Sequence, residues 1–519
     1  MTRSLGPAWF RQDAAASPWL PMPPRVRDVA RPVSRPIDPR LTEALLGQNT
    51  GPARDAVAHI AQGAPTVVTG QQVGLFGGPL YTLYKIWTAL RWAKALSIHW
   101  NEPVVPVFWV QEEDHDVQEV AWFGCRDENE VPYRFRLDSA PGRTSLAHRA
   151  LPVECESAVS VLPRRLASTV FADELCSVVR EAYAPGRSWS DAFVRLLVWI
   201  FDGTPLVILR PRCPEVAALA APVHREVLNR HSALLASLQE RSAAIERAGF
   251  AVQVPIRDHT LSFIHPEGAN GPRFRLIPNG QRAYLTPDGT RLSADRISGW
   301  LTDDPLRFSS SALLRPAIQD TLLNTAGYVA GPGEASYFGQ IEPLYRHLGL
   351  RMPMLLPRAR FRILEPWAVR LLRRWSCEPK DAEGSFDDLL AQMCGSVPSN
   401  AAERRVREEL VLIRQDALTR LRRATADLPL EGPTAALERK LERDLDRFES
   451  KLGRICRRMD DDRLAAARRL WMTFCPEGLP QERFFGLAYY LAQMGRAGLI
   501  QAMDACWKPG TLETQDLTS

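Results

Sequence analysis

The pattern of hydrophobic and polar positions is most regular between residues 66 and 116. Two short apolar runs, Thr66–Thr69 and Val104–Val110, are rich in β-branched residues and predict buried strands. The apolar positions between them recur at helical spacing: Leu80, Leu83, Tyr84, Trp87 and Leu90. Pro79 stands where this helix would begin, and its fixed φ suits the first helical position. The stretch therefore predicts a strand–helix–strand unit.

Polar residues follow both predicted strands. Gln71, Gln72 and a glycine-rich turn at Gly74–Gly78 follow the first strand, and Glu112–Asp116 follow the second. In open α/β sheets, ligands bind at the carboxyl ends of the strands. We therefore expect a ligand site where these two polar segments meet.

A similar pattern recurs between residues 310 and 357. A short strand at Tyr328–Ala330 leads into the turn Gly331–Gly333, followed by a helix over about 334–347 and a strand over 352–356. Glu334 in the first helical turn would interact favourably with the helix dipole, or the same backbone amides would receive an anionic ligand. Two such turns, each ending a buried strand, favour a doubly wound, nucleotide-type α/β core. The nucleotide-binding candidates are Gly74, Gly77, Gly78, Gly331, Gly333 and Glu334.

The remaining pattern predicts further elements around this core. Residues 1–40 are rich in Pro and Arg and should run extended, because Pro at this density does not sustain a helix. Helices are expected over 41–62, 165–200 and 215–249, strands over 132–137, 205–211 and 250–256, and a small antiparallel hairpin over 273–291.

Residues 401–474 carry apolar positions three and four residues apart, with charged residues between them. The positions are Val406, Leu410, Ile413, Ala417 and Leu421, then Leu437, Leu441, Leu445, Phe448, Leu452, Ile455 and Met459. This spacing, interrupted at 429–433, predicts two helices paired as an antiparallel coiled-coil arm. We therefore divide the chain into a core over 1–380 with insertions at about 120–310, a coiled-coil domain over 381–475, and a helical segment over 476–519 that returns to the core.

Composition and charge exclude several classes of function. A net charge of +5 over 519 residues gives no argument for a nucleic-acid or membrane surface. The nine Cys form no CxxC pair, no segment resembles a secretion signal, and no apolar run is long enough to cross a membrane. We expect a cytoplasmic protein with reduced thiols and no dedicated metal site.

The candidate chemistry centres on the segment after the second strand. Its catalytic candidates are Glu113, Asp114, His115 and Asp116. Crowded acids repel one another, which raises some pKa values unless a cation compensates. The cluster suits a general base, a magnesium site or a clamp for an ammonium group, or it is a solvated acidic loop.

Substrate-binding candidates surround the two glycine turns. They are Gln71, Gln72, Lys85, Trp109, Arg315, Gln319, Asn324, Tyr337 and Gln340. The two Gln would orient a carboxylate or amide, or would satisfy local backbone groups. Lys85 would reach back toward the first turn and a phosphate, or would be solvated. No Ser-His-Asp order, GxGxxG or Walker A pattern is present, so the residues alone indicate a ligand-binding α/β enzyme with a coiled-coil arm.

Several longer strings resemble one family. They are TGQQVGLFGGPLYTLYK (69–85), PVVPVFWVQEEDHDVQEV (103–120), LLRPAIQDTLL (313–323), YVAGPGEASYFGQI (328–341) and LPQERFF (479–485). In content and order they resemble the bacillithiol-biosynthesis cysteine-adding enzymes, the cysteine ligases, over nearly the whole chain. Asn324 is a departure, since the family is expected to carry Pro there.

The resemblance implies a Rossmann-like core with connecting insertions and a coiled-coil domain that mediates homodimerisation. The implied reaction joins the carboxyl group of cysteine to the glucosamine amine of glucosaminyl-malate, giving bacillithiol. An amide does not form from a free carboxylate and an amine in water without activation, so ATP is the expected co-substrate, with Mg²⁺ as its possible companion. The rival readings are another amide-forming ligase or nucleotidyl transferase on the same core, and a coiled-coil scaffold protein.

Overall fold

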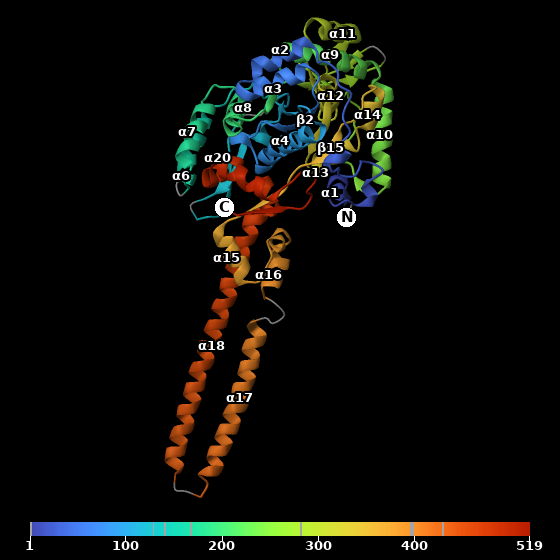
Figure 1. Cartoon of the computed structure of the whole chain (residues 1–519). Helices are drawn as coiled ribbons and strands as arrows, with labels where there is room; N and C mark the ends of the chain where they lie inside the picture. Colours follow the sequence, from blue (N-terminus) through green and yellow to red (C-terminus); the bar gives the residue numbers. More distant parts are fainter. Residues whose placement is uncertain are drawn as a thin grey trace. The chain divides into compact units, whose positions relative to one another are not determined.

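The computed structural model describes residues 3–127, 129–139, 142–166, 169–280, 283–394, 399–427 and 430–518. The chain forms two compact units (Figure 1). The first comprises Met1–Ile363 and Glu482–Ser519, and the second comprises Leu364–Gln481. The division therefore falls at 363/364 and 481/482, whereas the sequence pattern placed it at 380/381 and 475/476.

A five-stranded parallel sheet forms the centre of the first unit. Its strands lie in the order β15 (Met354–Pro357), β14 (Thr325–Ala330), β2 (Thr66–Gln72), β3 (Val105–Gln111) and β6 (Val207–Leu209). This confirms the predicted α/β class. The strand order reverses between β2 and β14, and ligands bind at such switch points.

The predicted strand–helix–strand unit is also confirmed. Helix α4 (Leu80–Trp100) connects β2 to β3, and the two strands pair from Thr66↔Val105 to Gln72↔Gln111. Because this register is unbroken, the polar ends of both strands lie level at one edge of the sheet. Each strand extends one to three residues beyond its predicted carboxyl end, which brings Gln71 and Gln72 into β2 itself.

The sheet is buried on both faces, as expected where parallel strands are covered by helices. On one face, Val68, Val107 and Tyr328 belong to the main apolar core. On the other, Phe108 contacts Phe193 of α8 (Trp189–Ile200), with 6.2 Å between the ring centroids. Successive strand residues point to opposite faces, so each strand contributes to both layers.

The helices of the first unit surround this sheet. Besides α4 and α8 they are α1 (Leu5–Phe10), α2 (Pro39–Gln48), α3 (Gly51–Ala61), α5 (Val117–Val120), α6 (Glu154–Leu166), α7 (Ala172–Ala182), α9 (Pro214–Asn229), α10 (His231–Arg247), α11 (Ala294–Asp303), α12 (Arg315–Leu322), α13 (Pro332–Phe338), α14 (Glu342–His347) and α20 (Leu487–Cys506). The short helix α19 (Gln481–Phe484) begins at the boundary between the units.

Short strands form small separate sheets. Strand β1 (Arg3–Ser4) pairs with β7 (Phe250–Ala251), and β4 (Trp122–Arg126) pairs with β5 (Pro132–Arg136). Strands β13 (Phe308–Ser310), β8 (Ser262–Ile264) and β9 (Phe274–Arg275) form one three-stranded sheet, and β10 (Ile277–Pro278), β11 (Ala283–Leu285) and β12 (Arg291–Ser293) form another. The sheet β10-β11-β12 corresponds to the antiparallel hairpin predicted over 273–291. The chain also contains β16 (Phe361–Leu364) and β17 (Gln515–Thr518).

Two predicted helices are interrupted. The helix expected over 41–62 is α2 and α3, because the Asn49 side chain leaves the helix and bonds to the backbone N–H and C=O of Ile208 in β6. The helix expected over 334–347 is α13 and α14. Pro343 lacks the N–H that would continue the helical hydrogen bonds through the break at Gly339–Ile341.

Two segments that were predicted to be extended also differ from the prediction. The strand expected over 250–256 is limited to Phe250–Ala251, because the Gln340 side chain takes both backbone groups of Val254. The first 40 residues are not wholly extended, because α1 forms ahead of the proline-rich stretch. The backbone N–H of Gly6 in α1 donates to Ser336 Oγ at 2.8 Å.

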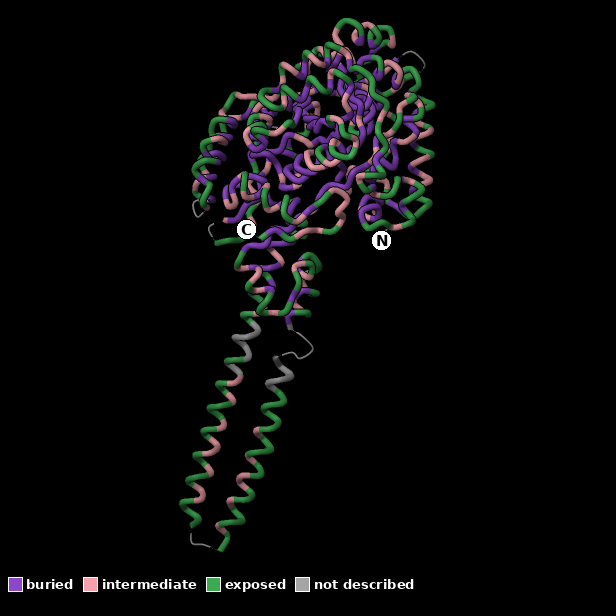
Figure 2. Tube along the Cα trace, in the orientation of Figure 1, coloured by how far each residue is buried: buried purple, intermediate pink, exposed green. Residues whose placement is uncertain are grey.

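The second unit contains the predicted antiparallel arm. Its helices are α15 (Pro366–Arg374), α16 (Phe386–Cys394), α17 (Ser399–Ala424) and α18 (Glu431–Phe474). Three ion pairs link α17 to α18: Arg407–Glu449, Arg414–Glu442 and Arg422–Glu438. From one pair to the next, the residue number increases along α17 and decreases along α18. The helices are therefore antiparallel. Figure 2 shows that exposed residues predominate along both, and the predicted seam residues Ile413 and Phe448 are 56% and 51% exposed.

Some expectations fall outside the described residues. The side chain of Met459 and part of the interruption at 429–433 lie there. Among the residues that the structure does describe, no helix combines the length and apolar character needed to cross a membrane.

Candidate functional site

A pocket of about 460 Å³ opens at the carboxyl edge of the parallel sheet. One wall is the segment that follows β3, with Glu113, Asp114, His115 and Asp116. The other walls come from residues 254–261 and from the sheet β13-β8-β9. All four predicted catalytic residues therefore line one pocket. A larger cavity of about 830 Å³ involves Asn324 and the amino ends of β14 and β15, away from this segment.

Neighbouring carboxylates at the end of β3 have different surroundings. Glu112 is buried, accepts a hydrogen bond from Arg210 Nε at 3.0 Å and contacts the Ser190 hydroxyl. Glu113 lines the pocket and accepts a hydrogen bond from the Ser310 hydroxyl. Burial raises the pKa of Glu113, although Ser310 and nearby arginines oppose this effect. Glu112 is therefore a structural anchor, and Glu113 is the carboxylate available to a ligand.

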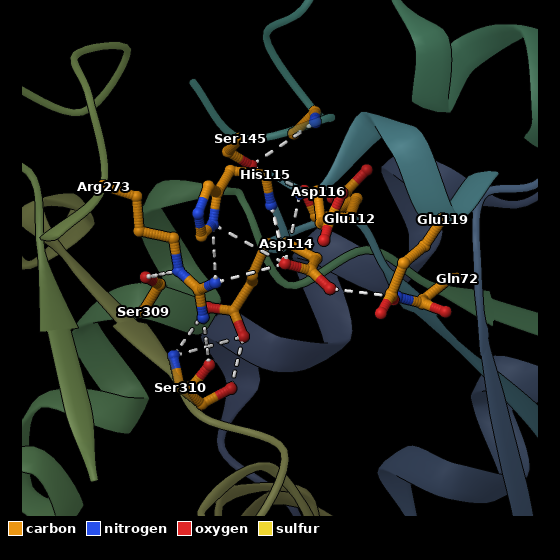
Figure 3. Close-up of polar contacts among 12 residues, drawn as sticks. Gln72, Glu112, Asp114, His115, Asp116, Glu119, Ser145, Arg273, Ser309 and Ser310 are labelled. Atoms are coloured by element: carbon orange, nitrogen blue, oxygen red, sulfur yellow. Dashed lines mark hydrogen bonds and ion pairs between the residues drawn. The ribbon is translucent and has the colours of Figure 1, made fainter. Parts of the chain in front are cut away.

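Asp114 is held by donors from three parts of the chain (Figure 3). Its Oδ2 accepts from Gln72 Nε2 at 3.0 Å, and its Oδ1 accepts from the His115 backbone N–H at 2.8 Å and from Arg273 Nη1 at 3.3 Å. Burial alone would raise the pKa of Asp114, but Arg273 and these hydrogen bonds outweigh it and the pKa is lowered. Asp114 is therefore an ionised carboxylate at neutral pH.

The two residues after Asp114 differ in environment. Burial and the positive charge of Arg273 lower the pKa of His115, whose Nδ1 lies 3.2 Å from Arg273 Nη1. Asp116 caps α5 by accepting a hydrogen bond from the backbone N–H of Gln118 at 3.0 Å. Gln72 also donates to Glu119 of α5 at 2.6 Å, so the end of β2 is tied directly to this segment.

Lys85 and Glu334 connect the two glycine turns. Lys85 does reach back along α4, donating to Gly70 O at 2.7 Å and Gln71 Oε1 at 2.9 Å. Its ammonium also lies 2.5 Å from Glu334 Oε2, and Glu334 accepts the backbone N–H of Gly331. Burial lowers the pKa of Lys85 to about 8, against the opposing effect of Glu334. The Glu334 carboxylate already occupies this turn, so the turn does not fit a phosphate in this arrangement.

A buried polar network lies behind the pocket. Arg315 lines the pocket and donates to the Tyr328 and Tyr337 hydroxyls at 3.1 and 2.8 Å. Gln319 is fully buried and donates to Asp320 at 3.0 Å. Of the residues predicted around the second glycine turn, Arg315 is the one that lines the pocket, and Tyr337 and Gln319 support it from behind.

Asp320 provides a pH-dependent contribution to stability. Burial raises its pKa to about 6, against the hydrogen bonds that it accepts from Tyr345 and Gln319. Its ordinary value is about 3.9, so the folded state binds a proton more tightly. This contribution is full below about pH 4 and is lost as the pH rises through 6, in total on the order of 3 kcal/mol. Denaturant unfolding between pH 4.5 and 7.5 should show this loss in the wild type and not in Asp320→Asn. Equal slopes in both proteins would contradict the assignment.

The other predicted residues lie outside the pocket. Trp109 is buried behind Glu113, where its Nε1 has no hydrogen-bond partner among the described residues and both side chains line an enclosed cavity of about 10 Å³. Gly74, Gly77 and Gly78 form the turn around the 3₁₀ helix Leu75–Gly77, in which the Gly77 N–H donates to the buried Tyr183 hydroxyl at 3.1 Å. Gly333 belongs to the first turn of α13.

Sequence reasoning missed several residues that complete the pocket. They are Arg257, His259, Phe263, Arg273, Arg275 and Ser310. All lie in or next to the predicted insertion, where the pattern consists of short elements without a motif. Arg273 is 159 residues from Asp114, and no local spacing indicates that they meet. Among the described residues, no group of three or more His, Cys, Asp or Glu side chains is placed to hold a metal ion.

Comparison with known proteins identifies the family. Residues 39–359 match the family model "Bacillithiol biosynthesis BshC, N-terminal Rossmann-like domain", and residues 399–513 match the BshC C-terminal coiled-coil domain. A protein of Salinibacter ruber named "Putative cysteine ligase BshC" is 31% identical over 91% of this chain and 88% of its own length. Proteins with the same name from Solibacter usitatus and Symbiobacterium thermophilum are 32% and 31% identical, over 88% and 82% of this chain and 84% and 79% of their own lengths. The chain therefore belongs to the BshC family of bacillithiol biosynthesis and is a ligase.

Proposed function

We propose that this protein joins the carboxyl group of cysteine to the glucosamine amine of glucosaminyl-malate, forming bacillithiol in an ATP-dependent reaction. The observation that carries the proposal is the pocket at the carboxyl edge of the sheet, in which Asp114 and His115 face arginine side chains. Membership of the BshC family supplies the class of reaction, and the names of its relatives suggest cysteine as one substrate.

The charges of the pocket suit these substrates. Cysteine carries an ammonium and a carboxylate, and glucosaminyl-malate carries an amine and the carboxylates of malate. Asp114 is the ionised carboxylate suited to hold an ammonium group or to accept a proton from the attacking amine. Arg257 and Arg275 at the pocket wall are suited to bind carboxylates, because a guanidinium offers paired N–H donors.

ATP is proposed as co-substrate because a free carboxylate needs activation before it forms an amide. The bound nucleotide would supply a phosphoryl or adenylyl group to the carboxylate. Lys85 and the turn at Gly331–Glu334 are engaged with each other, so they are poor candidates for binding its phosphates. The arginines of the pocket wall are better placed to do so.

The decisive experiment is an assay of the purified full-length protein by mass spectrometry. Reactions contain cysteine and glucosaminyl-malate with Mg-ATP, without Mg-ATP, or with serine replacing cysteine. We expect bacillithiol only when cysteine and Mg-ATP are both present. ATP consumption without bacillithiol, with cysteine or with serine as the carboxyl donor, would indicate a different amide-forming ligase. Absence of both product and ATP consumption would favour the scaffold function.

The coiled-coil unit is proposed to mediate a homodimer in the cytoplasm. Ile413, Leu437 and Phe448 on α17 and α18 are each more than half exposed, although they belong to the apolar repeat. Such residues are usually covered by another helix in a coiled coil. A monomer mass by light scattering at micromolar concentration would contradict this part of the proposal.

A further inference from the structure

Arg273 is fixed in a single orientation by the sheet β13-β8-β9. Its side chain is buried, and its guanidinium lies 3.8 Å from the centroid of the Phe263 ring. Nε donates to Ser309 Oγ at 3.0 Å, and Nη2 donates to the backbone carbonyl of Ser310 at 2.7 Å. These contacts leave Nη1 to face the segment after β3. There it lies 3.3 Å from Asp114 Oδ1 and 3.2 Å from His115 Nδ1.

The contact with His115 determines where the imidazole proton can be. A guanidinium has N–H donors and no acceptor, so the nitrogen that it approaches must accept. A proton on Nδ1 would instead face the N–H of Arg273. The other acceptor near Nδ1 is Asp114 Oδ1, and the 3.6 Å between these two atoms is longer than a normal hydrogen bond. That oxygen is already occupied by the His115 backbone N–H and by Arg273.

We infer that Arg273 holds His115 as a neutral imidazole with its proton on Nε2, so that His115 donates a hydrogen bond to substrate and does not act as a base. The acceptor is an oxygen of the carboxyl group that is being joined to the amine. This role rests on the proposed ligase function, whereas the protonation state of the resting enzyme does not.

The charges around His115 support a neutral ring. Burial lowers its pKa, and Arg273 and Arg143 lower it further, whereas Asp114 and Asp116 raise it. The net effect is a pKa below the ordinary value of about 6.5. A neutral imidazole with a fixed tautomer is a suitable donor to an oxygen on which negative charge develops. In this scheme the amine releases its proton to Asp114, the ionised carboxylate in contact with Arg273.

The test is the nitrogen NMR spectrum of the full-length protein labelled with ¹⁵N-histidine. The signal of His115 is assigned by its absence from His115→Gln. In the wild type we expect an unprotonated Nδ1 and a protonated Nε2 at pH 7, and a titration midpoint below 6.5. An imidazolium or an Nδ1–H tautomer at pH 7 would overturn the inference, whether or not the protein proves to be a cysteine ligase.

Two arginine variants separate the effect of Arg273 from general changes. Arg273→Gln should raise the pKa of His115 and allow the tautomers to mix. Arg275→Gln is the matched control, because Arg275 also lies near the Phe263 ring but has no contact with His115, and it should leave the spectrum of His115 unchanged. If Arg273→Gln does not fold, the titration of wild-type His115 still decides the question. Equal spectra in folded Arg273→Gln and wild type would contradict the role of Arg273.

Activity then tests the donor role. His115→Ala should lower kcat by about 10²–10³-fold, as loss of one hydrogen bond to a developing oxyanion does. His115→Gln keeps an N–H donor and should retain more activity than His115→Ala. The acidic limb of the wild-type pH profile should be absent near 6.5. Equal losses in both variants, with an acidic limb near pH 6.5, would show that His115 is a base.

Discussion

Replacing Glu482 by Gln is expected to lower the free energy of unfolding of the first unit by about 3–5 kcal/mol. The side chains of Arg358 and Glu482 are 2% and 11% exposed. They form a two-point contact, with Arg358 Nη1 2.7 Å from Glu482 Oε2 and Nη2 bonded to Oε1. Glu482→Gln preserves the shape and removes the negative charge, so the Arg358 guanidinium remains buried without its counter-charge.

Guanidinium chloride unfolding measures this effect, and a double variant controls for it. Arg358→Met with Glu482→Leu removes both charges, and it should be more stable than Glu482→Gln alone, because no buried charge is left unpaired. Glu342→Gln is a surface control, since its pairing with Arg346 is exposed and should contribute about 0.5 kcal/mol or less. A loss below about 1 kcal/mol in Glu482→Gln would show that the buried pair adds little.

Asp114→Asn is expected to lower the rate of ligation by about 10²–10⁴-fold, the usual contribution of a positioned acid or base. The protein groups bonded to Asp114 are all donors, from Gln72, His115, Asp116 and Arg273. An amide at this position carries no charge, cannot accept a proton from the amine, and presents its own N–H groups to those donors. Both the charge and the arrangement of the segment are therefore affected.

Steady-state rates and the folded spectrum should be compared with those of Asp304→Asn. Asp304 is a partly exposed aspartate that pairs with Arg307 and does not line the pocket, so this variant should keep wild-type activity. A circular dichroism spectrum equal to that of the wild type would show that Asp114→Asn is folded. A rate within about threefold of wild type would remove Asp114 from the chemistry and leave Glu113 as the base.

The sequence was most informative where one local pattern determines one element. The strand–helix–strand unit was predicted because apolar runs and helical spacing are properties of short segments, and the acidic segment was placed at the sheet edge by the same argument. Lys85 was harder to interpret, because the sequence places it on the polar side of its helix, where a lysine is often solvated. Its burial against Glu334 depends on α13, more than 200 residues later.

Interactions between distant segments account for what could not be predicted. The break between α2 and α3 exists because Asn49 pairs with β6, and the short β7 exists because Gln340 satisfies Val254. The position of Arg273 also depends on a distant segment, because the sheet β13-β8-β9 places it next to Asp114. No spacing within residues 254–275 distinguishes it from the many other arginines of the chain.

The opposite environments of Glu112 and Glu113 limit how this segment can change in length. Glu112 follows the last residue of β3 directly, so inserting one residue after Gln111 would move Glu112 to the present place of Glu113, and Glu113 to the present place of Asp114. The carboxylate that pairs with Arg210 in the interior would be presented to substrate, and Arg210 would lose its buried partner. Composition would be almost unaltered, yet both the anchor and the site would be lost. Homologues and redesigned variants should therefore keep Glu112 and Glu113 directly after the last residue of the strand.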